Sequence, residues 1–224
     1  MKQLFKGKQL TQRKLINSII RFYLLSTPSE LKDGLNWYNE AYDYSKELAK
    51  RFNISLSQAV GIVSAFSPQA GWLENKRYTV SFLISPKVQV RSMVQQLKAK
   101  HILTLNNESD IYHALSTNGT AFKTKSFFLN ILNPDIITDV TIDRHAIAVC
   151  IQDTDTVSAL DKSYAKLTKK QYDFFQSAYA SAAKELNILP HQLQAITWLT
   201  YRRIRKLKAD QNTGEFVPFT NEEF

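Results

Sequence analysis

Apolar residues recur at helical spacing along nearly the whole chain, and this pattern is the strongest constraint on the fold. Two of the apolar stripes consist of Leu15, Ile16, Ile19, Ile20 and Tyr23, which follow Thr11 as an N-cap residue, and of Trp37, Ala41, Tyr44 and Leu48. A repeat of three to four residues is typical of amphipathic helices. Strand-compatible runs at residues 88–90 and 136–140 are short and have no obvious pairing partner. We therefore predict an all-α fold of about nine or ten helices.

Proline and capping residues give approximate bounds for several of these helices. Ser57 is the expected cap of a buried helix that stops at Ser67-Pro68, and another helix is expected from Trp72 to Leu83. Further helices are expected at residues 88–103, 108–117, 123–132, 143–151, 170–187 and 191–207. We predict one helical domain over residues 1–209 and a loosely ordered polar tail over residues 210–224.

The composition narrows the class of partner. The chain has 224 residues, 44% of them hydrophobic, with 29 Lys+Arg against 20 Asp+Glu, a net charge of +9. That balance favours DNA or RNA as a partner, although a protein can simply be basic. The single Cys150 and four histidines exclude an internal disulfide and a Cys-rich zinc or iron–sulfur site, so no metal or cofactor is expected. No window approaches the roughly 18 apolar residues of a membrane helix. We expect a cytoplasmic, DNA-associated protein with no membrane contact and no obligate protein partner.

A turn at residues 118–121 leads into a basic and aromatic helix. Gly119 suits the positive φ of such a turn, and Lys123 and Lys125 follow in the first turn of the next helix. Because the two lysines project in different directions, at most one of them should reach a given reacting atom. Either lysine is also compatible with a solvated surface cation or a phosphate contact.

Asp143 stands directly before an apolar helix, where it is expected to cap the helix N-terminus. Capping and catalysis are compatible, because a helix N-terminus favours an ionised carboxylate. Such a carboxylate can stabilise positive charge at C1′ of a nucleotide as its base leaves, or activate the attacking nucleophile. A neutral lysine can instead attack C1′ itself, form a Schiff base and go on to cleave the strand. With water as the nucleophile, the product is an abasic site.

Two blocks together resemble the helix-hairpin-helix DNA glycosylases of the endonuclease III type. The first runs from Gly119 through Lys123 to Ile142-Asp143-Arg144-His145, and the second spans residues 63–75. The resemblance covers residues 55–155 and implies a two-lobed helical fold around a cleft, which binds duplex DNA with an extruded nucleotide. It implies catalytic roles for Asp143 and for Lys123 or Lys125. It implies DNA-binding roles for Gln69, Asn75, Gly119, Arg144 and His145, with Gln69 filling the gap left by the extruded base.

The chain departs from that family at the hairpin. Ala121 stands where the family has its second glycine, and the interval from Lys123 to Asp143 is longer than the family's. If Lys125 is the family's lysine, its spacing to Asp143 is closer to that of the family, but its spacing from Gly119 no longer matches. The cysteines of a C-terminal iron–sulfur cluster are absent.

Two aromatic features add candidate DNA contacts. Trp72 follows a turn and can either stack on a base or pack in the core. Gln194, Trp198, Tyr201 and Arg202 share one helix face, from which Gln194 and Arg202 would read a base edge or hold a phosphate. The alternative is a packed helix with Arg202 reaching to solvent. The basic run at residues 202–208 favours salt-dependent contact with a nucleic-acid backbone.

These features predict a DNA N-glycosylase that flips out a damaged or modified base and cleaves its glycosidic bond, with lyase activity if a lysine acts. The same fold can serve a transferase that hypermodifies DNA bases. A third possibility is a non-catalytic DNA-binding or inhibitory protein on the same scaffold.

Overall fold

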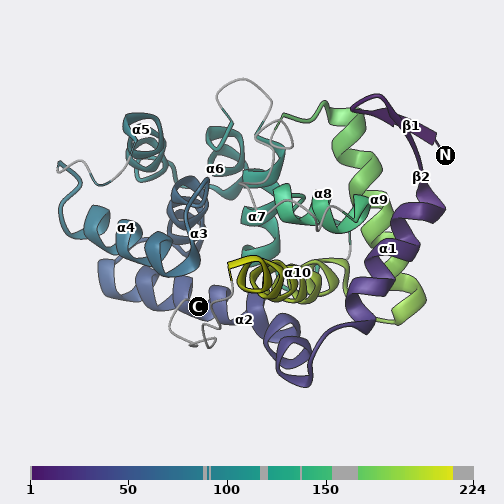
Figure 1. Ribbon diagram of the computed structural model, residues 1–224. Coiled ribbons are helices and arrows are strands. Elements are labelled where there is room, and N and C mark those ends of the chain that lie inside the picture. The colour runs from purple at the N-terminus through teal and green to yellow at the C-terminus, as the bar shows by residue number, and fades with distance from the viewer. Residues whose placement is uncertain are drawn as a thin grey trace. The chain divides into compact units, whose positions relative to one another are not determined.

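The computed structural model describes residues 2–87, 90, 92–116, 121–136, 138–152 and 166–213. Within these ranges the chain forms ten helices and one two-stranded hairpin, which confirms the all-α prediction (Figure 1). The strands are β1 (Lys2–Phe5) and β2 (Lys8–Thr11). The helices are α1 (Gln12–Leu24), α2 (Pro28–Phe52), α3 (Leu56–Phe66), α4 (Trp72–Ile84), α5 (Met93–Ile102), α6 (Glu108–Ala114), α7 (Phe122–Leu132), α8 (Arg144–Ile151), α9 (Lys169–Leu186) and α10 (Pro190–Thr213).

The contacts divide the chain into two compact units. Unit 1 contains the described residues of Met1–Tyr38 and Asp135–Pro218, and unit 2 contains those of Asn39–Pro134. The division falls inside α2, after Tyr38. In the described part of the chain, no helix has the length and apolar character needed to cross a membrane.

Unit 1 is built around α1, which packs against α8, α9 and α10. The buried face of α1 includes Ile19, and the Ser18 hydroxyl donates to the carbonyl of Val149 at 2.5 Å. The β1–β2 hairpin lies beside α9, where the ring of Phe5 packs edge-on against Phe175 at 5.3 Å (Figure 1). The sequence pattern did not predict this hairpin, which turns through Lys6 and Gly7 at positive φ.

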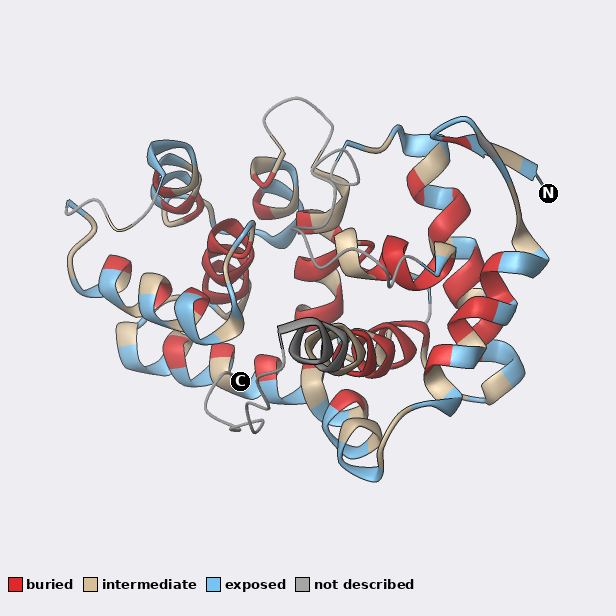
Figure 2. Ribbon diagram, viewed as in Figure 1, coloured by how far each residue is buried: buried red, intermediate tan, exposed pale blue. Residues whose placement is uncertain are grey.

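Unit 2 is built around α3, which contacts α4, α5, α6 and α7. Buried residues cover α3 along most of its length (Figure 2). The Ser55 side chain accepts from the backbone N–H of Gln58, whose side chain accepts from the backbone of Ser55 in return. The expected cap, Ser57, is therefore wrong: Ser57 lies inside the helix, and the reciprocal pair with Gln58 places the start two residues earlier.

The bounds of three other helices differ from the expected ones by more than three residues. The helix expected at residues 88–103 begins at Met93, where Ser92 is the cap. The helix expected around Trp37 already begins at Pro28, and the last helix continues to Thr213 rather than ending near residue 207. The segment expected to be a polar tail thus begins within α10, and residues 214–224 lie outside the described residues.

Candidate functional site

Asp143 caps the N-terminus of α8 in unit 1. Its backbone is extended, and its Oδ1 accepts a 2.8 Å hydrogen bond from the backbone N–H of Ala146. The side chain is 15% exposed, so the carboxylate is sheltered but reachable. Behind it, the apolar residues of α8 from Ala146 to Cys150 are buried and hold the helix in place. The capping position predicted from the sequence is confirmed.

His145 lies next to this carboxylate and connects it to an aromatic surface on α10. Its Nδ1 is 3.4 Å from Asp143 Oδ2, and its side chain is 25% exposed. The imidazole packs edge-on against the rings of Trp198 and Tyr201, with centroids 6.0 and 5.8 Å away. The carboxylate and the imidazole therefore form a pair, and two aromatic rings of α10 pack against the imidazole.

Two arginines extend the aromatic surface of α10 with positive charge. The Arg202 guanidinium lies 4.7 Å from the centroid of the Trp198 ring, and that of Arg205 lies 5.7 Å from the Tyr201 ring. Each arginine follows its aromatic partner by four residues, so both contacts lie along one side of α10. In contrast, Arg203 donates to the Glu30 carboxylate and to the carbonyl of Leu25, which ties α10 to the start of α2.

Gln194 lies on the same helix but faces the interior. It is 5% exposed, and its Oε1 accepts a 3.1 Å hydrogen bond from the Tyr38 hydroxyl. Tyr38 also bonds the Thr141 side chain, two residues before Asp143. Burial raises the pKa of the Tyr38 phenol well above its ordinary value; the Thr141 bond lowers it, and the charges of Asp143 and Asp139 raise it further. Gln194 thus supports the interior of unit 1 in this structure.

The candidates in unit 2 follow the turn between α3 and α4. Gln69 is exposed and has a positive φ of 60°. Trp72 begins α4 half-buried, edge-on to Tyr44 at 5.6 Å, and Lys76 Nζ lies 5.4 Å from the Trp72 ring. Asn75 is only 2% exposed, and its amide donates to the carbonyl of Val63 at 3.0 Å. Asn75 therefore joins α4 to α3, whereas Gln69 lies at the surface.

Lys123 and Lys125 lie in the first turn of α7, as expected, and both are half-buried. Lys125 Nζ lies 4.5 Å from the centroid of the Tyr112 ring. Gly119, the residue of the expected hairpin, lies outside the described residues. The two lysines belong to unit 2, whereas Asp143 belongs to unit 1.

Several residues near Asp143 or on the aromatic face of α10 were not predicted from the sequence. Arg205 lay within the recognised basic run, and its spacing from Tyr201 was the available signal. Tyr172 and Gln176 of α9 both donate to the carbonyl of Val140. Like Thr141, they carried no signal in the sequence, because their contacts depend on how the chain folds. Arg144 opens α8 and is half-buried. Among the described residues, no group of three or more His, Cys, Asp or Glu side chains is arranged to hold a metal ion.

The fold and site define an all-α protein with a sheltered carboxylate–imidazole pair at a helix N-terminus, beside an aromatic and cationic helix face. The chain belongs to the DUF7178 family, a family of unknown function, whose model matches residues 1–206. A search of curated proteins and a search of solved structures found no match.

Proposed function

We propose that this protein is a DNA N-glycosylase-like enzyme and that Asp143 is its catalytic carboxylate. The observation that carries the proposal is the position of Asp143: it caps α8, is sheltered from water and lies 3.4 Å from His145. A carboxylate held at a helix N-terminus keeps its negative charge at low cost. It is also fixed in place, which is what electrostatic catalysis requires.

In the proposed reaction, the N-glycosidic bond breaks and its electron pair leaves with the base. The Asp143 carboxylate stabilises the positive charge that develops at C1′ of the sugar. Water attacks C1′ and loses a proton, so the products are the free base and an abasic site. His145, paired with Asp143, either receives that proton or donates one to the departing base.

The order of elements supports a glycosylase-like fold. α6 and α7 flank the residues of the proposed hairpin, and α8 follows with its capping aspartate. We propose that the domain is two-lobed, as the resemblance to helix-hairpin-helix glycosylases implies. Under this proposal, Gly119, Gln69 and Trp72 contact the DNA.

The charge of the protein supports DNA as the partner. The net charge is +9, and Arg202 and Arg205 add guanidinium groups beside two aromatic rings of α10. Guanidinium groups bind phosphates, and aromatic rings stack on exposed bases. We assign Arg144, Arg202 and Arg205 to phosphate contacts, and Trp198 to stacking.

The test is to incubate the protein with duplex oligonucleotides that carry a panel of damaged and modified bases, and to analyse the products by mass spectrometry. The proposal predicts a free base and an abasic strand for at least one substrate. A strand of increased mass would instead identify a base-modifying transferase. DNA binding with no product from any substrate would identify a non-catalytic DNA-binding protein, and both of these results contradict the proposal.

Variants of Lys123 and Lys125 distinguish a glycosylase that uses water as its nucleophile from one that uses a lysine and also cleaves the strand. If Lys123 or Lys125 attacks C1′, borohydride reduction traps a covalent protein–DNA adduct, and the Lys→Gln variant of that residue loses it. Lys50→Gln is a suitable control in unit 2, because Lys50 is an exposed lysine in the last turn of α2. If no adduct forms and both α7 variants release base normally, the enzyme has no lyase activity and water is the nucleophile.

A further inference from the structure

The segment that leads into Asp143 is irregular but buried. Val140, Thr141 and Ile142 are 0%, 4% and 3% exposed, and they belong to neither a helix nor a strand. Buried backbone N–H and C=O groups need hydrogen-bond partners, which regular secondary structure does not supply here. We name residues 138–143 the Asp143 loop. Side chains from other parts of unit 1 form hydrogen bonds with several of its buried polar groups.

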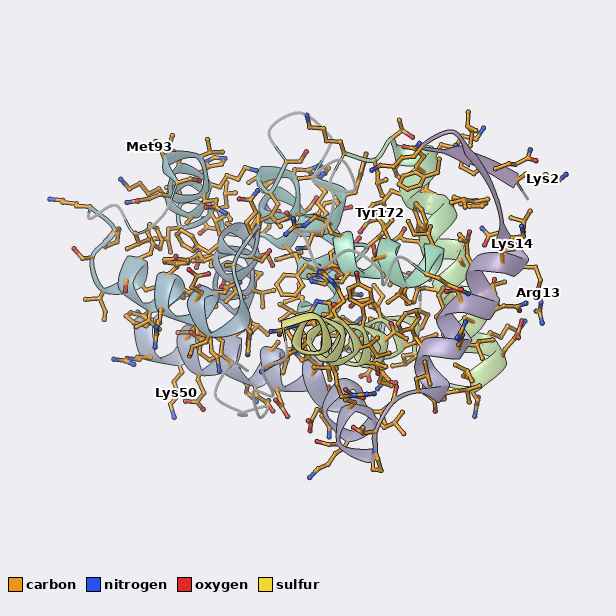
Figure 3. All side chains as sticks on the ribbon, in the orientation of Figure 1. Lys2, Arg13, Lys14, Lys50, Met93 and Tyr172 are labelled. Carbon is orange, nitrogen blue, oxygen red and sulfur yellow. The ribbon has the colours of Figure 1, made fainter. Side chains whose placement is uncertain are left out.

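Tyr172 of α9, labelled in Figure 3, satisfies two backbone groups of this loop with one hydroxyl. It donates to the carbonyl of Val140 at 3.1 Å and accepts from the N–H of Ile142 at 3.1 Å. Tyr172 is itself 4% exposed, so little water competes for these bonds. One phenol hydroxyl can both donate and accept, so the geometry uses its full capacity.

Gln176, one turn further along α9, binds the preceding part of the loop. Its Nε2 donates to Asp139 Oδ1 at 2.6 Å and to the carbonyl of Val140 at 2.9 Å. From α2, Tyr38 bonds the side chain of Thr141. Side chains from two helices of unit 1 therefore hold consecutive residues of the loop, directly before the catalytic candidate.

We propose that Tyr172 and Gln176 are positioning residues, which fix the Asp143 loop and thereby set the position of the Asp143 carboxylate. This inference rests on the function proposed above. Without the bonds to Tyr172, the N–H of Ile142 must find water or another acceptor, and the loop can shift. A displacement of about 1 Å at a catalytic group can lower the rate on the order of 100-fold.

The test compares Tyr172→Phe with Tyr179→Phe. Both tyrosines are buried on α9, but the Tyr179 hydroxyl lies 3.2 Å from the Thr197 hydroxyl on α10 and is not hydrogen-bonded to the described loop residues. Each change removes one buried hydroxyl and keeps the ring. Amide hydrogen exchange of residues 139–146 measures loop order without reference to activity, and single-turnover base release measures catalysis on a substrate from the oligonucleotide panel.

The inference predicts that Tyr172→Phe speeds exchange at Ile142 at least about 10-fold and slows base release about 10- to 100-fold with little change in DNA affinity. Tyr179→Phe should change neither. Unchanged exchange at Ile142 would overturn the inference, as would faster exchange with normal base release. If the wild type releases no base from any substrate, the proposed function fails, and the exchange data still report whether the loop is held as described.

Gln176→Met provides a second variant if Tyr172→Phe does not fold. It keeps the length of the side chain but removes the amide that binds Asp139 and Val140. The inference predicts the same pairing of faster loop exchange with slower base release. Faster exchange with an unchanged rate would again count against a positioning role.

Discussion

Gly34 allows α2 to approach α10 closely within unit 1, and Gly34→Ala should therefore destabilise the protein. A Cβ at position 34 would lie 2.4 Å from Cγ1 of Ile196 and 2.7 Å from both its Cα and its backbone N. Ordinary contacts of a Cβ lie at 3.4–4 Å. Because two of the three clashing atoms are backbone, α2 and α10 must move apart rather than adjust a side chain.

Two opposing effects set the magnitude. Alanine favours the helix interior over glycine by about 0.5–1 kcal/mol. Overpacking a tight interface costs about 1–3 kcal/mol, and the backbone clash places Gly34→Ala at the upper end of that range. The net effect is a loss of about 2 kcal/mol, which for a chain of this size lowers Tm by about 4–8 °C.

Thermal unfolding followed by far-UV circular dichroism measures this effect, with Gly61→Ala as the matched control in α3. A Cβ at Gly61 would lie 2.7 Å from Cγ2 of Ile111 and 3.1 Å from Cγ2 of Ile102, both in side chains that can adjust. Gly61→Ala should therefore lower Tm less than Gly34→Ala. A Gly34→Ala variant as stable as the wild type, or a larger loss for Gly61→Ala, would refute this account of the packing.

Four further predictions concern stability, thiol reactivity, pH dependence and DNA binding. Asp143→Ala removes the cap of α8 and should cost about 1 kcal/mol in denaturant unfolding, whereas Asp143→Asn keeps a capping side chain and should cost only a few tenths. Burial raises the pKa of the Cys150 thiol, so a thiol reagent should modify Cys150 only after unfolding; rapid reaction of the native protein would contradict its burial. Burial also raises the pKa of the Tyr38 and Tyr179 phenols above the ordinary 10.0. Above pH 10 the unfolded state therefore loses these two protons while the native state keeps them. The contribution of the two phenols to the free energy of unfolding should be constant below pH 10 and should fall above it. If Arg202 contacts a phosphate, Arg202→Gln should reduce the slope of log K against log salt for DNA binding by about 1, and an unchanged slope would remove that contact.

The sequence predicted the helices well because their apolar residues face a core at regular spacing. The buried stripe of α1 and the capping role of Asp143 both follow from local patterns of this kind. The predicted cap, Ser57, was wrong because Ser57 and the actual cap, Ser55, are the same residue type, and only the reciprocal hydrogen bonds between Ser55 and Gln58 distinguish them. The β1–β2 hairpin was missed because its four-residue strands are too short to show a clear alternation.

The surroundings of Asp143 were less predictable for a different reason. Tyr172 and Tyr38 are distant from Asp143 in the sequence, and only the tertiary fold of unit 1 brings their hydroxyls to the loop. Gln194 was expected to reach a DNA base because it shares a helical face with Arg202. The structure buries its amide against Tyr38, since that part of α10 lies deeper in unit 1 than the part that carries Arg202.

The most direct test of the central claim is base release by Asp143→Asn under single-turnover conditions, with DNA affinity measured in parallel. Asparagine keeps the cap of α8 but removes the negative charge that would stabilise the positive charge developing at C1′. Asp173→Asn, which changes an exposed aspartate paired with Lys169 on α9, is the control. The account predicts that Asp143→Asn loses base release on the order of 100-fold or more while binding DNA as the wild type does. Normal base release by Asp143→Asn would contradict it.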